Sequence, residues 1–285
     1  MSLKIWLDGQ LVDQANAKIS VYDHGLLYGD GVFEGIRVYH GKLFEIQTHL
    51  RRLYDSAKAI RLSIPITQEE MKAAIVQTYR ANNFDDCYVR VVVTRGVGDL
   101  GINPKNSKLP SVFIIADLIA VYPREMYEKG MAVITASYIR NHPNAQSPRI
   151  KSLNYLNNIL AKIEANDAGV PEAVMLNHDG NVAECTADNI FIVRDSQVQT
   201  PNVTDGILEG VTRGVIMKLC KTNKIDCVER TLQRHDLYVA DEIFVTGTGA
   251  EVMPVTKVDG RVIGTGEPGT LTRKLIDLFK QYVRG

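Results

Sequence analysis

The chain has 285 residues, of which 45% are hydrophobic and 23% charged. Its 33 Lys and Arg residues match its 33 Asp and Glu residues, so the formal net charge is zero. The length predicts one large or two modest domains, and the charge balance argues against a nucleic-acid or membrane partner.

The four cysteines predict neither a metal site nor a disulfide framework, because they are dispersed and form no Cys-x-x-Cys pair. We therefore expect reduced thiols in a cytoplasmic protein. Residues 1–9 lack the basic and apolar regions of a signal peptide. The most apolar run, residues 111–122, is too short to span a bilayer and is expected to be a buried strand.

In chain order, the first third predicts hairpins and two helices. Asp8-Gly9 and His40-Gly41 join apolar runs as hairpin turns do. Helical spacing covers residues 47–62, and Thr67 starts a capping-box helix that ends near Asn82. Strands are then expected at 88–94 and 111–122, on either side of a glycine-rich loop, 95–104.

The polar stretch 121–128 predicts a linker between a domain of residues 1–120 and one of residues 129–285. Later strands are expected at 130–139, 172–176, 189–193 and 241–246. Later helices are expected at 153–169, 212–223 and 270–283.

Lys151 lies just before one of these predicted helices and is a candidate nucleophile. The positive partial charge of a helix N-terminus disfavours a nearby ammonium, so the amine would be more often neutral. A neutral lysine amine attacks carbonyl groups and forms Schiff bases. A solvated surface lysine is the alternative at this stage.

Two further segments suit an anion. Gly210-Val211-Thr212 precedes a predicted helix, and Thr248-Gly249 follows a predicted strand. A Rossmann motif is excluded at Gly247-Thr248-Gly249, because no third glycine is correctly spaced and a hairpin follows where a helix is required. A Schiff-base lysine with anion-binding turns suggests pyridoxal phosphate; a non-catalytic binding protein and a nucleotide-dependent enzyme remain alternatives.

Four separated motifs, in order, make the whole chain resemble the class IV (fold-type IV) pyridoxal-phosphate aminotransferases, which include branched-chain-amino-acid and D-amino-acid enzymes. They are Tyr28-Gly29-Asp30-Gly31-Val32-Phe33-Glu34-Gly35-Ile36-Arg37, Lys151-Ser152-Leu153-Asn154-Tyr155-Leu156, Glu184-Cys185-Thr186-Ala187-Asp188-Asn189-Ile190-Phe191 and Gly247-Thr248-Gly249-Ala250-Glu251-Val252-Met253-Pro254-Val255. The resemblance implies a two-domain α/β (α+β) fold with a smaller N-terminal α+β domain, a larger C-terminal domain that bears the lysine, and the cofactor at their interface.

The resemblance also assigns cofactor contacts. Lys151 matches the lysine that holds pyridoxal 5′-phosphate as a Schiff base and shuttles the proton between the substrate α-carbon and cofactor C4′. Glu184 matches the carboxylate that pairs with the pyridine nitrogen, where a negative charge favours the protonated ring. The remaining matches are Arg52, Val211, Thr212 and Thr248 at the phosphate, Leu208 on the pyridine face and Tyr155 at the phenolic oxygen. No metal is implied.

On the substrate side, the matched positions are Tyr28, Phe33, Gly35, Arg37, Tyr88 and Arg90, with the Gly249-Ala250 turn at the substrate carboxylate. The loop 98–104 resembles one that reaches the neighbouring subunit's site, which implies a homodimer or a higher homo-oligomer. The implied reaction passes the amino group of Leu, Ile or Val to 2-oxoglutarate, giving glutamate and a 2-oxo acid.

Three features depart from the branched-chain pattern. The spacing from Lys151 to Tyr155 is one residue short, and Val93-Thr94-Arg95-Gly96 resembles the carboxylate-binding motif of the D-amino-acid enzymes, so Arg95 competes with Arg90 for the substrate carboxylate. The aromatic cluster of the interdomain linker is also missing. A D-amino-acid aminotransferase and an aminodeoxychorismate lyase therefore stay as alternatives.

Overall fold

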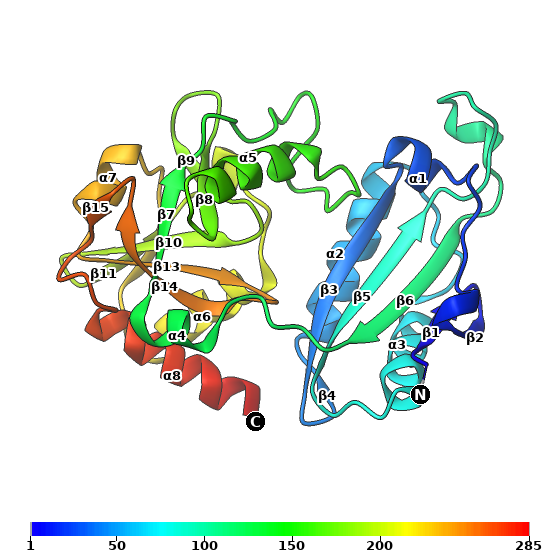
Figure 1. Cartoon of the computed structure of the whole chain (residues 1–285), viewed down its shortest axis with the longest axis horizontal. Coiled ribbons are helices and arrows are strands. Elements are labelled where there is room, and N and C mark those ends of the chain that lie inside the picture. The colour runs from blue at the N-terminus through cyan, green and yellow to red at the C-terminus, as the bar shows by residue number, and fades with distance from the viewer. Residues whose placement is uncertain (1, 285) are drawn as a thin grey trace. The chain divides into compact units, whose positions relative to one another are not determined.

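The computed structural model describes residues 2–284, which divide by their contacts into two compact units (Figure 1). Unit 1 holds residues 2–119 and 150–154, and unit 2 holds residues 120–149 and 155–284. The fold is mixed α/β, as the sequence predicts. The sequence places the domain boundary at 121–128 and Lys151 in the C-terminal domain. Instead, the lysine segment belongs by its contacts to unit 1.

Unit 1 is built on an antiparallel six-stranded sheet of order β2-β1-β6-β5-β3-β4. Its strands are β1 (Lys4–Leu7), β2 (Gln10–Asp13), β3 (Gly31–Tyr39), β4 (Lys42–Leu43), β5 (Cys87–Thr94) and β6 (Ser111–Asp117). The predicted hairpin turns at Asp8-Gly9 and His40-Gly41 join β1 to β2 and β3 to β4.

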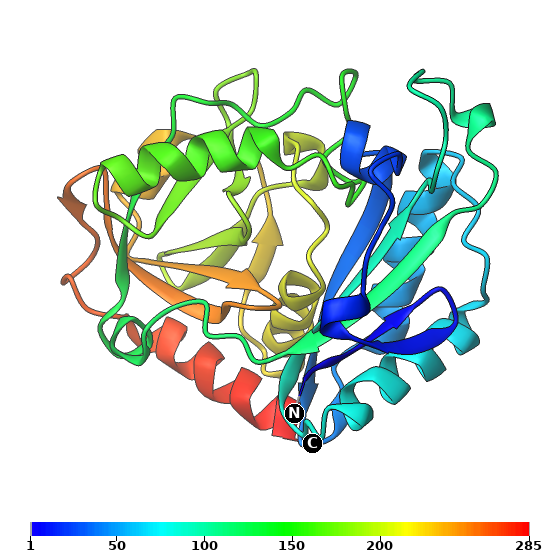
Figure 2. The same ribbon diagram turned by 45° about the vertical axis from the view of Figure 1, so that its right-hand side comes forward.

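Two long helices, α2 (Ile46–Ala59) and α3 (Gln68–Ala81), cover one face of this sheet (Figures 1 and 2). Leu50 and Leu53 of α2 and Ile75 of α3 face the core with Ile36 and Ile114. Thr67 and Glu70 form the predicted capping box of α3. A short helix, α1 (His24–Tyr28), precedes β3.

Unit 2 is built on a mixed nine-stranded sheet of order β12-β11-β10-β13-β14-β7-β8-β9, with β15 paired to β14. Its strands are β7 (Met131–Thr135), β8 (Glu172–Leu176), β9 (Val182–Cys185), β10 (Asn189–Arg194), β11 (Gln197–Thr200), β12 (Cys227–Glu229), β13 (Glu242–Gly247), β14 (Glu251–Val258) and β15 (Arg261–Val262). The β11–β12, β14–β7 and β7–β8 pairs are parallel.

The helices of unit 2 are α4 (Arg124–Lys129), α5 (Leu156–Asp167), α6 (Val211–Thr222), α7 (Arg234–Tyr238) and α8 (Thr270–Arg284). The stretch predicted to be a linker, 121–128, thus overlaps α4. Helix α5 packs against β8, and α6 packs against α8 (Figure 2). Phe191 and Phe244, fully buried on neighbouring strands, stack with their ring centroids 4.9 Å apart. Throughout residues 2–284, every helix is too short or too polar to cross a membrane.

Candidate active site

Lys151 lies in an extended segment that pairs with β3 of unit 1. The amide of Phe33 donates to the Lys151 carbonyl at 3.0 Å, and Leu153 donates to the Gly31 carbonyl at 3.0 Å. The Lys151 ammonium nitrogen lies 4.4 Å from the centre of the Phe33 ring. Helix α5 begins only at Leu156, so the helix-dipole argument for Lys151 lacks its structural basis. Pairing with β3 fixes the backbone of Lys151 instead.

Arg52 is held by a buried carboxylate, Glu34 of β3. Arg52 Nε donates to Glu34 Oε1 at 2.7 Å and Arg52 Nη2 donates to Oε2 at 2.9 Å. His49, one turn earlier on α2, lies with Nδ1 2.7 Å from Glu34 Oε2. Burial alone would raise the pKa of Glu34, but the charges of Arg52 and His49 lower it well below its usual range. The carboxylate is therefore ionised at neutral pH.

The predicted substrate residues of β3 and β5 in unit 1 meet across one strand pair. Arg37 is paired with Tyr88, and Gly35 with Arg90. The Arg90 guanidinium lies 4.6 Å from the centre of the Phe33 ring and donates to the Tyr88 hydroxyl at 3.1 Å. The same side of the sheet thus combines an aromatic surface with a cation that suits a carboxylate.

Arg95 is placed differently. Its guanidinium forms a two-pronged ion pair with Asp30, at 2.9 and 2.8 Å, and donates to the carbonyls of Arg61 and Ile60 at 2.7 and 2.8 Å. Only 7% of Arg95 is exposed. These contacts tie the end of β5 to the end of α2, and they favour Arg90 over Arg95 as the carboxylate ligand.

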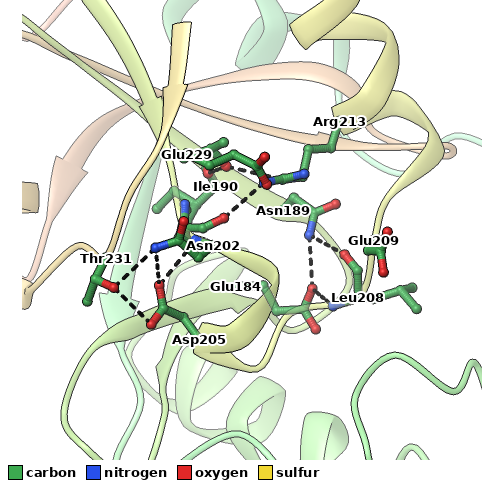
Figure 3. A network of polar contacts seen from close by, with 12 residues as sticks. Glu184, Asn189, Ile190, Asn202, Asp205, Leu208, Glu209, Arg213, Glu229 and Thr231 are labelled. Atoms are coloured by element: carbon green, nitrogen blue, oxygen red, sulfur yellow. Dashed lines mark hydrogen bonds and ion pairs between the residues drawn. The ribbon is translucent and has the colours of Figure 1, made fainter.

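Glu184 is buried on β9 of unit 2, and Figure 3 shows two of its hydrogen-bond donors, Asn189 and Leu208. Arg140 Nε donates to its Oε1 at 2.8 Å, while the Leu208 amide and Asn189 Nδ2 each donate to its Oε2 at 3.0 Å. Asn189 also donates to the Leu208 carbonyl at 2.9 Å. The carboxylate is thus fixed in direction, and the segment before α6 is fixed to it.

The start of α6 suits an anion. Its N-cap, Gly210, supplies no side-chain cap, and the first backbone N–H groups of any helix lack partners inside the helix. The Thr212 hydroxyl is buried and has no hydrogen-bond partner within residues 2–284. In the same first turn, Arg213 is turned away to Glu229 at 2.5 Å and to the Pro201 carbonyl at 2.9 Å (Figure 3). Val211 is buried.

Asp188 and Asn189, which follow β9, lie against the two predicted anion turns of unit 2. A Cβ on Gly247 would lie 1.9 Å from Asp188 Oδ1, and one on Gly210 would lie 1.9 Å from Asn189 Oδ1. A larger residue at either position would therefore force the Asp188 or Asn189 side chain to shift. The Glu184 strand end, the start of α6 and the Gly247–Ala250 turn, with Thr248 and Gly249, consequently lie at one place. Ala250 is buried there.

Two predicted site residues lie at helix ends. Tyr155 is the N-cap residue of α5 in unit 2. Tyr28 ends α1 in unit 1 and is 38% exposed, and its hydroxyl donates to the Leu100 carbonyl.

The comparisons with known proteins decide the family. The model of the amino-transferase class IV family matches residues 31–258. The chain belongs to the class IV aminotransferases.

Curated relatives support the same family over nearly the full chain. A Methanocaldococcus jannaschii protein named "Putative branched-chain-amino-acid aminotransferase" is 51% identical, with 98% of this chain and 96% of that protein covered. The branched-chain-amino-acid aminotransferase of Pseudomonas aeruginosa is 38% identical, with 99% of this chain and 93% of that protein covered.

Solved class IV structures agree. The crystal structure of the Escherichia coli branched-chain amino acid aminotransferase is 35% identical, has a TM-score of 0.96 and covers 99% of this chain and 94% of its own. The Thermobaculum terrenum branched-chain amino acid aminotransferase, crystallised in its pyridoxal-phosphate form, is 30% identical with a TM-score of 0.91 and covers 99% and 94% of the two chains.

Sequence reasoning missed three residues of this class IV chain: Arg140 at Glu184, and Glu34 with His49 at Arg52. Arg140 follows directly on a run whose pattern predicts a strand, and Glu34 lies inside a motif that assigns it no role. The helical spacing of His49 and Arg52, three residues apart, was the available signal, because it places both on one face of α2.

A pH-dependent effect on stability is expected from Asp188. It lies beside Glu172, and the Tyr122 hydroxyl is 3.2 Å from Asp188 Oδ2 and 3.4 Å from Glu172 Oε2. Burial, together with the negative charge of Glu172, raises the pKa of Asp188 from 3.8 to about 7, against the opposing hydrogen bond from Tyr122. Glu184 also raises this pKa, and Lys162 lowers it.

Because folded Asp188 keeps its proton up to about pH 7 and the unfolded chain loses it near 3.8, this group costs stability as the pH rises between those values. Urea unfolding at pH 5 and pH 8.5 should therefore show that Asp188→Asn gains stability relative to the wild type at the higher pH. A stability difference that stays constant with pH would contradict a buried proton at Asp188.

Proposed function

We propose that this chain is a pyridoxal-phosphate-dependent transaminase that transfers the amino group of Leu, Ile or Val to 2-oxoglutarate. The observation that carries the proposal is the fixed, buried Glu184 carboxylate beside the uncapped start of α6. The names of the relatives and structural neighbours support the substrate class. We place the reaction in the cytoplasm, because the four cysteines are free thiols.

The residues of unit 2 fit a phosphorylated pyridine. Thr212 offers a buried hydroxyl without a partner, and the α6 N-terminus and the Thr248 turn offer backbone N–H groups to a phosphate. Glu184 offers an acceptor to a protonated ring nitrogen, and Leu208, whose amide is held by Glu184, offers an apolar side chain to the ring face. From unit 1, Arg52 binds the phosphate, and from unit 2, Tyr155 binds the phenolic oxygen.

When bound, pyridoxal phosphate supplies an aldehyde that joins an amine and a ring that stabilises negative charge at the substrate α-carbon. Lys151 holds the cofactor through its amine and then takes and returns the proton of the substrate α-carbon. Because transamination runs in two half-reactions, the same amine serves both directions. Glu184 would accept a hydrogen bond from the proton-bearing ring nitrogen, and Arg140 holds the Glu184 carboxylate in place.

On the substrate side, Arg90 binds the carboxylate, while Phe33 and Tyr88 offer the aromatic surface that a branched aliphatic side chain needs. Tyr28, Gly35 and Arg37 complete the pocket, and the Gly249-Ala250 turn offers N–H groups to the carboxylate. The D-amino-acid alternative depends on Arg95, whose guanidinium binds Asp30 and two carbonyls. The L-amino-acid reading therefore has the stronger support.

A donor panel tests the substrate class. Purified protein with pyridoxal phosphate and 2-oxoglutarate should form glutamate from L-Leu, L-Ile and L-Val. Glutamate formed from D-alanine alone would replace this proposal by the D-amino-acid activity. Release of pyruvate from aminodeoxychorismate would indicate the lyase.

The assembly we propose is a homodimer. Large apolar side chains are exposed on α1 and on the long loop that follows β5 in unit 1: Leu26, Val97, Leu100, Ile102 and Leu109 are 54–82% exposed. His24 of α1 lies with Nε2 2.8 Å from the Asp99 carbonyl, so the loop is fixed to α1. An apolar surface of this kind fits a second copy of the chain. Sedimentation should give twice the 31.7 kDa chain mass, or a higher multiple, and a 31.7 kDa species would contradict it.

A further inference from the structure

Glu34 is a fully buried carboxylate in the middle of β3 that the proposed mechanism does not use. Within residues 2–284, its ion pairs and hydrogen bonds with side chains go to one face of α2. Its two oxygens accept hydrogen bonds from Arg52 Nε and Nη2 at 2.7 and 2.9 Å, and Oε2 also lies 2.7 Å from His49 Nδ1. No part of the Glu34 or His49 side chain is exposed, and 13% of that of Arg52 is exposed.

The same face of α2 reaches the lysine segment. His49, Arg52 and Ser56 follow one another at three- and four-residue spacing, which places them in one row on the helix. The Lys151 amide donates to Ser56 Oγ at 3.2 Å, and the Lys151 carbonyl accepts from Phe33, the residue before Glu34. The Arg52–Glu34 pair is thus built into the same strand and helix that fix Lys151.

Stability alone gives a weak reason for such a group. Burying a carboxylate and a guanidinium costs desolvation energy that their attraction only roughly repays, and apolar residues of similar volume are often as stable. The pair instead fixes the orientation of the Arg52 guanidinium. A carboxylate bound along the Nε–Nη2 edge fixes the plane of the guanidinium.

We propose that Glu34 is a positioning residue for the cofactor phosphate, acting through Arg52 and steadied by His49. The inference rests on the proposed function, in which Arg52 binds that phosphate. Since the carboxylate adds a negative charge near the phosphate, its benefit has to come from a fixed guanidinium and outweigh the repulsion. His49 Nδ1–H donates to the ionised Glu34 carboxylate at 2.7 Å, and burial lowers the pKa of His49.

The test compares pyridoxal phosphate with pyridoxal, which lacks the phosphate. Dissociation constants of both are measured by calorimetry on the full chain after the cofactor has been dialysed away. In Glu34→Gln, an NH₂ group replaces one of the carboxylate oxygens. It cannot accept the hydrogen bond that Arg52 or His49 donates there. The constant for pyridoxal phosphate should rise about tenfold or more, while that for pyridoxal changes less than about twofold.

A double-mutant cycle tests the route through Arg52. Arg52→Gln should lose the same discrimination between the two ligands, and Glu34→Gln combined with Arg52→Gln should lose no more than Arg52→Gln alone. Additive losses would show that Glu34 acts without Arg52 and would overturn the proposal. If Glu34→Gln does not fold, Glu34→Asp, which keeps the charge but is one methylene shorter, should show the same loss to a smaller degree.

Glu70→Gln is the matched control, because it removes a carboxylate of the same unit whose hydrogen bonds go to Thr67 at the start of α3. It should lower the melting temperature and leave the ratio of the two constants unchanged. Wild-type ratios in Glu34→Gln, or an equal loss in Glu70→Gln, would refute the positioning role. A wild-type chain that binds neither ligand would instead refute the proposed function.

Discussion

Lys151→Ala should abolish transamination while the protein stays folded. The side chain is half-buried, and its backbone contacts to Phe33 and Ser56 do not involve the side chain that is removed. Loss of proton transfer alone accounts for about 10²–10⁴-fold in rate, and loss of the covalent cofactor link adds to it. The rate of glutamate formation and the visible absorption of the cofactor, measured on the same sample, check this prediction.

Lys162→Ala is the control for this change. Lys162 lies on α5, the helix that follows the lysine segment, and its ammonium donates to the Pro171 carbonyl. This variant should keep both the activity and the visible absorption of the wild type. Full activity in Lys151→Ala would contradict the assignment.

The second large effect is expected for Glu184→Gln. All three neighbours of this carboxylate are donors: Arg140, Asn189 and the Leu208 amide. The new NH₂ group must therefore face a donor, and Arg140, which is 7% exposed, loses its counter-charge. We expect a loss of about 10²–10³-fold in rate, typical of a removed electrostatic contact, and about 3 kcal/mol in stability.

Steady-state rates and urea unfolding separate these two effects. Glu242→Gln serves as the control, since Glu242 accepts from the amides of Leu271 and Thr272 at the start of α8 in the same unit. It should cost stability without a comparable loss in rate. If Glu184→Gln retains the wild-type rate, the carboxylate has no part in holding the ring nitrogen.

Local patterns predicted most of the secondary structure because the contacts that carry them are local. The capping box of Thr67 and Glu70 marks the start of α3, and residues 172–176 form the predicted strand β8. Two predicted strands, 111–122 and 130–139, extend past the ends of β6 and β7 because apolar residues that lie in solvent continue the pattern. Leu118 and Val121 follow β6, and Tyr138 and Ile139 follow β7, and all four are at least 40% exposed.

The surroundings of the site were predicted less well because they depend on long-range contacts. Ser152 bridges to Val32, 120 positions away in the chain, and this pairing, absent from any local pattern, places Lys151 in unit 1. Arg140 reaches Glu184 from 44 positions away, and a buried ion pair of that separation leaves no periodic signal. The motifs located the reactive residues, whereas their supporting groups became visible only in the fold.

Borohydride reduction of the pyridoxal-phosphate form, followed by peptide mapping, tests the central claim most directly. The added mass of the reduced cofactor should be found on the peptide that contains Lys151 and on no other lysine. Cofactor mass on Lys162, or on any lysine other than Lys151, would contradict the account of this active site.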